Sequence, residues 1–335
     1  MMADITPEMS TPSVAANIPV TSEPVTTVSS EPFTAVPTNG STVTSVTATA
    51  SVTTAPVPTP SPASKQAKWT FWHSVSALAA LVATGCVSWF VPSRLTVWII
   101  IVVLLTLFIV ITANGTTGDW RGALIDDRNT ISLSRLQMSV WTILILSALL
   151  TAGITNIRLD PLVLTGHLGT TSSGGFTALG INIPSNIWLL LGIATTSLVA
   201  TPLILNTKTA KPADDGQTQT TMNQLAQQRR DGDSVTNKGQ LIYNTTSANA
   251  RWSDLFTGEE VGNAAQFDLG KIQLFYFTFI LALVYAIALG ALFASQEAAI
   301  KAFPDMDAGM LALLGISHAG YLVNKAVPHS ADPGQ

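Results

Sequence analysis

The stretch Leu95–Ala113 reads LTVWIIIVVLLTLFIVITA and contains no Asp, Glu, Lys or Arg. The hydrocarbon core of a bilayer is about 30 Å thick and an α-helix rises about 1.5 Å per residue, so about 20 apolar residues cross it. Four other apolar stretches also lack these charged residues: Trp69–Val91, Met138–Ile157, Ile187–Leu205 and Ile272–Phe293. The sequence therefore predicts an all-α integral membrane protein.

A sixth apolar stretch, Met310–Val327, is shorter than most of the others and more polar, since it contains Ser317, His318 and Asn324. A re-entrant or interfacial helix is one interpretation of this stretch. The internal repeat described below favours a full crossing. We therefore expect about six transmembrane helices.

The composition also favours a membrane protein, because only 11% of the 335 residues are charged and 47% are hydrophobic. Soluble domains carry about 25% charged residues. Residues 1–68 are different, since they are rich in Thr, Ser and Pro and have too little apolar surface to offset the entropy of ordering. We expect a disordered N-terminal tail there, without the pattern of a secretory signal.

The 16 Lys and Arg residues are distributed unevenly across the predicted membrane. Arg94, Arg158 and Lys301 fall on one side, and the other 13 fall on the opposite side. Because cytoplasmic loops carry the excess of basic residues, both termini and the loop 207–255 are predicted to be cytoplasmic. An external mucin-like stalk is the alternative interpretation of the tail, but it would place the 13 basic residues outside.

An internal repeat aligns Trp120–Ile157 with Phe256–Phe293 without a gap. Within it Ser132 matches Asp268, and both are good N-cap residues. The sequence Leu-Leu-Gly-Ile then occurs at 190–193 and again at 313–316. Each unit is an interfacial segment followed by a helical hairpin, and the two units are parallel repeats.

This repeat divides the chain into six parts. They are a disordered tail (1–68), a transmembrane hairpin (69–114), repeat 1 (115–206), a cytoplasmic loop (207–255), repeat 2 (256–327) and a C-terminal tail (328–335).

Threonines in the spans are candidate site residues. Thr142 and Thr278 are equivalent in the two repeats, and each shares a helical stripe with a basic residue seven positions earlier, Arg135 or Lys271. Thr195 follows the Leu-Leu-Gly-Ile sequence in repeat 1. One interpretation is a ring of hydroxyl groups that lines a pore. The other is ordinary helix packing through small and hydroxyl residues.

His318 is the only ionisable residue deep within a predicted span. Ionisable residues inside membranes are usually functional, and an unperturbed imidazole pKa of about 6.5 makes His318 a candidate proton site. A neutral imidazole bonded to another helix is the structural alternative. Residues near the ends of the spans are predicted to anchor the chain at the headgroups: Trp69, Trp72, Trp141, Trp188, Arg135 and Lys271.

Catalytic and ligand-binding motifs are lacking in the sequence, so we expect no enzyme, cofactor or metal site. Residues 126–129, Asp-Asp-Arg-Asn, lack the spacing of a calcium loop and are predicted to form a solvated turn. Glu259 and Glu260 are adjacent, and adjacent side chains point apart on a helix or strand. The net charge of −4 gives no basic surface for nucleic acid, and Cys86 is the only cysteine.

Three stretches carry a resemblance to other proteins: residues 127–141 with Ser-Leu-Ser-Arg-Leu-Gln at 132–137 and Trp141, residues 258–265, and residues 314–322, Leu-Gly-Ile-Ser-His-Ala-Gly-Tyr-Leu. With these the chain resembles a group of uncharacterised prokaryotic multi-pass membrane proteins over about residues 115–327. The resemblance implies a bacterial cytoplasmic (inner) membrane and brings no activity with it.

Three classes of function are compatible with these features. The first is a non-enzymatic homo-oligomeric channel or pore in the lipid bilayer. The second is a membrane anchor or sensor that docks a cytoplasmic protein partner through the loop between residues 206 and 271. The third, an ion-coupled transporter, is disfavoured because the five strongest spans contain no acidic or basic residue to bind a coupling ion.

Overall fold

The computed structural model divides the chain into two units, Met1–Thr59 and Pro60–Gln335. It describes residues 69–159, 178–229, 234–295 and 299–331, all of which belong to the second unit. The predicted disordered tail at 1–68 and the last four residues of the predicted C-terminal tail lie outside the described residues.

Long helices account for most of the described residues, which confirms the predicted, mostly helical architecture. They are α1 (Phe71–Phe90), α2 (Arg94–Thr117), α3 (Leu133–Leu159), α5 (Ser185–Thr209), α7 (Leu269–Ala294) and α8 (Ala308–Ala326). The first five are long and apolar enough to cross a membrane, as a multi-pass membrane protein requires. The sixth, α8, is long enough but not among these five, because it is more polar, so the sixth crossing stays a prediction.

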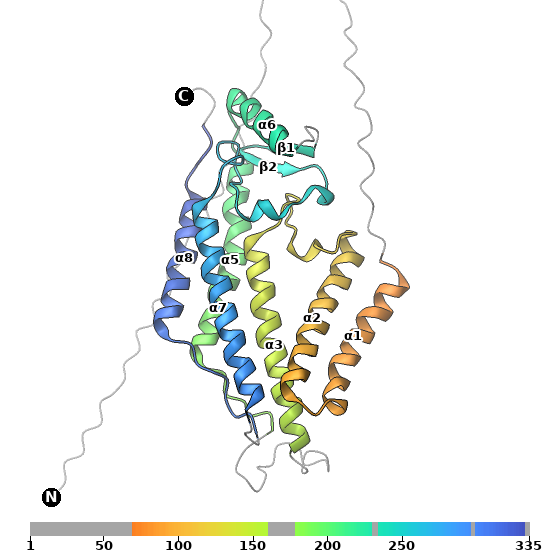
Figure 1. The fold of residues 1–335 in the computed structure, drawn as a ribbon. Helices are drawn as coiled ribbons and strands as arrows, with labels where there is room; N and C mark the ends of the chain where they lie inside the picture. Colours follow the sequence, from red (N-terminus) through yellow and green to blue (C-terminus); the bar gives the residue numbers. More distant parts are fainter. Residues whose placement is uncertain (1–68, 160–177, 230–233, 296–298, 332–335) are drawn as a thin grey trace, which may run out of the picture. The chain divides into compact units, whose positions relative to one another are not determined.

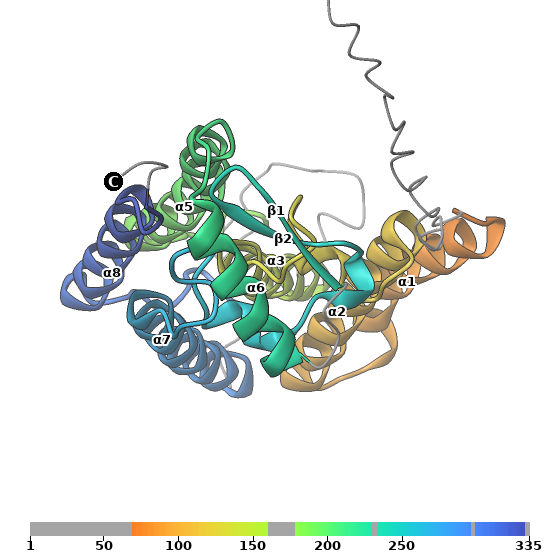
Figure 2. The same cartoon turned by 90° about the horizontal axis from the view of Figure 1, so that it is seen from above.

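Two helical hairpins, α3–α5 and α7–α8, form a four-helix bundle. In it α3 packs against α5 and α7, and α8 packs against the same two helices from the opposite side (Figure 2). The hairpin α1–α2 lies outside this bundle and contacts it mainly through α2 against α3 (Figure 1). In the structure α1 and α2 thus pack as a helical pair beside the bundle, and the predicted transmembrane hairpin at 69–114 stays a prediction.

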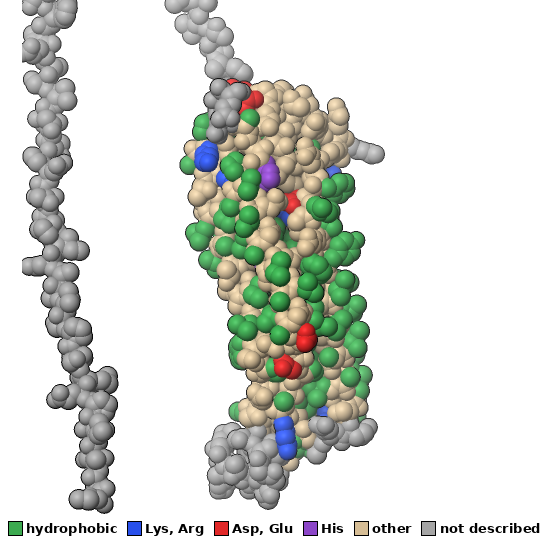
Figure 3. Space-filling view, turned by 90° about the vertical axis from the view of Figure 1, so that its left-hand side faces the viewer, with side chains coloured by type: hydrophobic (Ala, Val, Ile, Leu, Met, Phe, Trp, Pro, Cys, Tyr) green, Lys and Arg blue, Asp and Glu red, His purple; other side chains and the backbone are tan. Residues whose placement is uncertain are grey.

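The outer surface of the bundle is apolar. On α8 the large side chains Leu313, Ile316 and Val323 are exposed, and hydrophobic side chains extend over much of the face shown in Figure 3. In water such a surface would favour aggregation. Contact with lipid hydrocarbon removes that cost, so the surface agrees with a membrane location.

Trp141 is part of the bundle core. Its side chain is fully buried, and its ring centroid lies 6.4 Å from that of Tyr285 on α7. Nearby, Trp98 donates a hydrogen bond to the Ser147 hydroxyl over 3.0 Å. The prediction that Trp141 anchors the chain at the headgroups is wrong, because the neighbouring helices close over its ring.

The helices of the two predicted repeats begin at equivalent positions. The first residues of α3 and α7, Leu133 and Leu269, are partners in the sequence alignment. The buried faces differ, however, since Thr278 is buried whereas its aligned partner Thr142 is only half-buried. Helix starts therefore follow the alignment while packing does not, and the parallel repeats stay a prediction.

The described parts of the two hairpin connections, residues 178–184 and 299–307, meet at the end of the bundle near Asn156. Its side chain donates to the Ala178 and Ile300 carbonyls and accepts from the Ile300 amide over 2.9 Å. Beside it the backbone of Asn182 pairs with Lys301 and Phe303. These bonds hold the two connections side by side.

At the other end of the bundle lies a small folded layer, the described part of residues 210–268, which we call the cap. It contains helix α6 (Asp215–Arg229) and an antiparallel hairpin, β1 (Val235–Lys238) and β2 (Leu241–Asn244). A small apolar core packs α6 onto it through Leu225, Ile242 and Val261. The predicted cytoplasmic loop at 207–255 is thus ordered in large part, and it adds a short strand pair to the helical fold.

The two tryptophans Trp141 and Trp188 offer a matched test of this packing. Trp141→Ala leaves a large cavity in the core, so we expect a loss of about 3–5 kcal/mol of unfolding free energy. Trp188 is exposed, so Trp188→Ala should change stability little. Unfolding of each purified variant in detergent measures both effects, and equal losses would contradict the assigned packing.

Candidate functional site: a buried ion cluster

Glu259 and Glu260 lie next to each other on a tight loop of the cap. The Asn263 side-chain oxygen accepts hydrogen bonds from both of their backbone amides, over 3.1 and 3.0 Å. A Cβ atom at Gly258 would lie 2.2 Å from that same oxygen, so a larger residue does not fit this turn. The loop therefore holds the two adjacent carboxylates in place while their side chains point to different partners.

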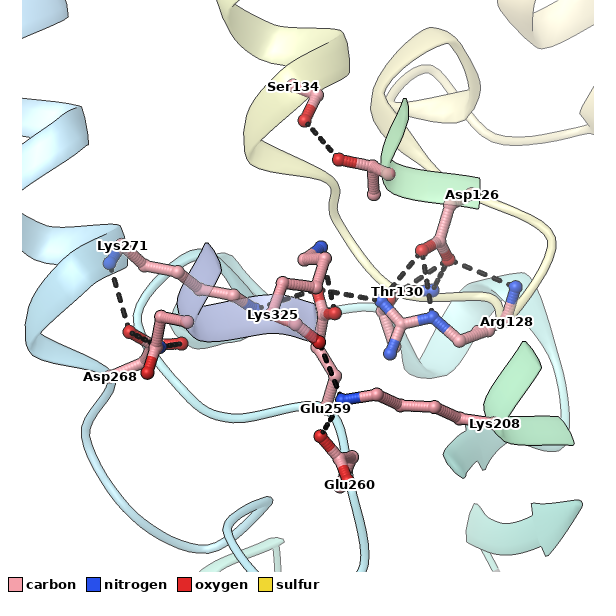
Figure 4. A network of polar contacts seen from close by, with 12 residues as sticks. Asp126, Arg128, Thr130, Ser134, Lys208, Glu259, Glu260, Asp268, Lys271 and Lys325 are labelled. Atoms are coloured by element: carbon pink, nitrogen blue, oxygen red, sulfur yellow. Dashed lines mark hydrogen bonds and ion pairs between the residues drawn. The ribbon is translucent and has the colours of Figure 1, made fainter. Parts of the chain in front are cut away.

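Glu259 binds three basic side chains. Its carboxylate lies 3.2 Å from Arg128, 3.0 Å from Lys271 and 2.8 Å from Lys325 (Figure 4). All four side chains are nearly buried. Charge-assisted bonds of this kind are stronger than neutral hydrogen bonds, so one carboxylate joins the ends of α7 and α8 to the turn that precedes α3.

Glu260 binds a fourth basic side chain, Lys208 near the end of α5. Their charged atoms are 2.5 Å apart, and both side chains are buried. The Lys208 ammonium also donates to the carbonyls of Lys325 and Val327, over 2.6 and 2.8 Å. All three ammonium protons therefore have an acceptor, and α5 is tied to the end of α8.

A turn before α3 positions Arg128. The Asp126 carboxylate accepts from the backbone amides of Arg128 and Thr130, each over 3.0 Å, and forms a 2.8 Å ion pair with Arg128. Asn129 adopts a φ of 58°, a left-handed conformation that Asn tolerates. Asn129 and Asn244 then exchange side-chain to backbone hydrogen bonds, which attaches the turn to β2.

This geometry corrects the prediction of a solvated turn at residues 126–129. Only Asp127 fits it, with 95% of its side chain exposed. Arg128 and Asp126 face the protein interior, where Arg128 is shared between the Asp126 and Glu259 carboxylates. The turn is thus part of a buried charge network.

The surroundings favour the charged forms of Glu259, Arg128 and Asp126. Burial raises the pKa of Glu259, but Arg128, Lys271 and Lys325 outweigh burial and hold that pKa well below its usual range. Burial lowers the pKa of Arg128, but the Glu259 and Asp126 carboxylates raise it by more. The pKa of Arg128 is therefore raised above its ordinary value. The pKa of Asp126 is also lowered, because Arg128 and the Thr130 amide overcome its burial.

The anchors predicted from the sequence have different surroundings. Trp69, Trp72 and Trp188 are exposed, as headgroup contact requires. Arg135 is partly exposed and lies 3.8 Å from Asp127. Lys271 is not a headgroup anchor, because its side chain is only 4% exposed and bound to Glu259.

The structure does not gather the predicted pore residues on one surface of the chain. Thr278 is buried and accepts a 2.6 Å hydrogen bond from Gln137. Thr195 is exposed and donates to the Leu191 carbonyl of its own helix, and Thr142 is half-buried. His318 is buried, with Nδ1 bonded to the Leu314 carbonyl over 2.9 Å.

The ion cluster is not among the sites predicted from the sequence. From the sequence alone, Glu259 and Glu260 are only an adjacent carboxylate pair, and Lys208 and Lys325 belong to the 13 basic residues that set the predicted orientation. The sequence does contain a usable signal. Lys208, Lys271 and Lys325 each lie at one end of an apolar span, and all three lie on the same predicted side of the membrane. Three such cations need anions close by, and the cap contains two adjacent glutamates.

The chemistry available at this cluster is ionic binding and positioning. Within the described ranges no group of three or more His, Cys, Asp or Glu side chains could hold a metal ion. The sequence matches no protein-family model, and no curated protein or solved structure is significantly similar to it. The resemblance to uncharacterised prokaryotic proteins therefore stays a prediction.

Glu259→Gln tests the cluster. The folded-state pKa of Glu259 lies below its ordinary value of 4.5, so its stabilisation is present above about pH 4.5 and is lost as the pH falls through the folded pKa. We expect the variant to lose about 3–5 kcal/mol at pH 7, because cations remain buried without their anion. Its stability should then fall less than that of the wild type on acidification.

Unfolding in detergent between pH 7 and pH 3 measures both effects. The matched control is Asp127→Asn, which neutralises an exposed acidic side chain and should retain the wild-type pH profile. Parallel acid profiles for the wild type and Glu259→Gln would contradict the role assigned to Glu259.

Proposed function

We propose that the protein is a non-enzymatic membrane anchor or sensor, in which the helical bundle holds the cap in position for a cytoplasmic protein partner. One observation carries the proposal: the two adjacent glutamates of the cap bind basic residues at all four bundle helices or next to them. Arg128 precedes α3, while Lys208, Lys271 and Lys325 belong to α5, α7 and α8.

Such a cluster couples the cap to helix movement. If one helix end shifts, a cation moves away from its carboxylate, and a buried charge without a partner is costly. The cap must then follow the helix or rearrange. A change in the bundle, caused by the bilayer or by a second copy of the chain, would thereby alter the surface that the cap offers to its partner.

The exposed side of α6 is the surface that we assign to the partner. Its residues Gln219, Asn223, Gln224 and Gln227 are exposed, polar and uncharged, whereas Leu225 on the opposite side is buried in the cap core. The excess of basic residues at this end of the spans favours a cytoplasmic location for the cap and both termini. The proposal includes the bacterial cytoplasmic membrane and six crossings.

A single cysteine on α6 tests location and docking together. In a Cys86→Ser background, Asn223→Cys should react with a membrane-impermeant maleimide only in inside-out vesicles, while Lys301→Cys at the other end should react only in right-side-out vesicles.

A photo-crosslinker attached at position 223 in native membranes should then capture one distinct protein. Capture should decrease in the Glu259→Gln background, since the cap is less firmly held. Labelling from the opposite side, or equal capture in both backgrounds, would refute the proposal.

A second candidate function, a pore or proton path, is favoured by polar atoms inside the bundle. Among the described residues, Gln137 Oε1, Trp141 Nε1, Tyr285 OH and His318 Nε2 are buried without a hydrogen-bond partner. Buried polar atoms are paired in most proteins, and atoms of this kind could bond a proton carrier or water. All four belong to helices of the bundle.

Ion flux in liposomes distinguishes the two functions. A path inside the bundle predicts that His318→Ala changes proton flux at mildly acidic pH, whereas a path between subunits predicts that Thr195→Ala does so. An anchor predicts ion-tight liposomes for the wild type and both variants. Unfolding temperatures in detergent confirm that each variant is folded before its flux is compared.

A further inference from the structure

A cavity of about 440 Å³ lies where the first turns of α3 and the second half of α5 meet the cap. Its two ends differ in character. Met138, Leu198, Pro202 and Leu205 from the membrane helices form a mostly apolar wall, which Ser139 and Thr201 interrupt. The charged lining residues, Asp126, Asp127, Arg128 and Arg135, lie at the end nearest the cap. A ligand that fills this cavity must therefore be polar at one end and apolar at the other.

Two ion pairs line the polar end, and they differ in strength. Asp126 and Arg128 form a short, buried pair. Asp127 and Arg135 are 3.8 Å apart at their closest charged atoms, and their side chains are 95% and 36% exposed. Such exposed pairs contribute little stability, so both side chains can exchange partners at little cost.

The opposite charges of Asp127 and Arg135 suit a zwitterion. Arg135 can form charge-assisted hydrogen bonds with a phosphate, and Asp127 can accept them from a primary ammonium group. A headgroup with a net negative charge suits this site less well, because its charge would lie near the Asp127 carboxylate. A quaternary ammonium has no N–H group to donate to the carboxylate, so a choline headgroup makes only part of these contacts.

We propose that this cavity binds a phospholipid with an ethanolamine headgroup. Arg135 contacts the phosphate, Asp127 contacts the ammonium, and an acyl chain lies along the apolar wall of α5. The inference rests on the proposed sensor function and adds its ligand. Arg128 lines the cavity and also belongs to the ion cluster, so an occupied cavity lies directly beside the contacts that hold the cap.

Native mass spectrometry of the full chain in detergent tests the proposal. The probes are phosphatidylethanolamine, phosphatidylcholine and phosphatidylglycerol with identical acyl chains. We expect phosphatidylethanolamine to bind about tenfold more tightly than phosphatidylcholine, as one charge-assisted hydrogen bond implies. Glycerophosphoethanolamine, the headgroup without acyl chains, should compete poorly. Effective competition by it would indicate a soluble phosphate ester as the ligand and overturn the lipid assignment.

Two variants separate the two contacts. Asp127→Asn should reduce phosphatidylethanolamine binding to the level of phosphatidylcholine and leave phosphatidylcholine binding unchanged. Arg135→Gln should weaken binding of both lipids about tenfold, and Lys301→Gln at the far end of the bundle is the control. Both substituted side chains are partly or largely exposed, and unchanged unfolding temperatures would confirm intact folds.

Equal binding of the three lipids, or an ethanolamine preference that survives Asp127→Asn, would overturn the proposal. This failure is distinguishable from failure of the proposed function. Capture of a partner from position 223 would remain if the cavity bound no lipid.

Discussion

Two adjacent carboxylates on one cap loop bind the cations beside four helices, and the arrangement of this part of the molecule depends on that interaction. Glu259 shares three cations, and Glu260 takes Lys208 together with the backbone amide of His329. Neither side of the contact could be buried alone, because isolated charges in an apolar environment are too costly. Cap and helix ends must therefore form their buried structure together.

Much of the fold could be predicted from the sequence, because spanning a bilayer imposes a length and a composition that one chain displays directly. The predicted span Leu95–Ala113 lies inside α2, and Met138–Ile157 lies inside α3. The predictions were weaker where a residue's environment depends on distant neighbours. Trp141 looked like an interfacial aromatic residue, but α7 packs over it, and Thr142 and Thr278 differ in burial despite their alignment.

The candidate site was hidden for the same reason. Arg128, Lys208, Glu259 and Lys325 are far apart along the chain, and local periodicity contains no information about which of them meet. Burial of these charged side chains could have been suspected from charge balance, since three lysines lie at the ends of apolar spans on the same side of the bundle. Of the buried polar atoms without a partner, the sequence pointed only to the one on His318. That Gln137 is buried with it depends on the packing of neighbouring helices, which the sequence does not show.

The shared cluster also bears on how this protein can be divided. A gene fragment that encodes the cap without the helices would produce a polypeptide with two carboxylates directed at cations that are no longer there. A fragment with only the helices would leave three lysines and one arginine without their glutamates. The α1–α2 hairpin lies outside the cluster, so recombination at residues 118–120 would remove it without dividing these charges. The cap therefore cannot be transferred as an independent module, because its two carboxylates require the cations beside the helices.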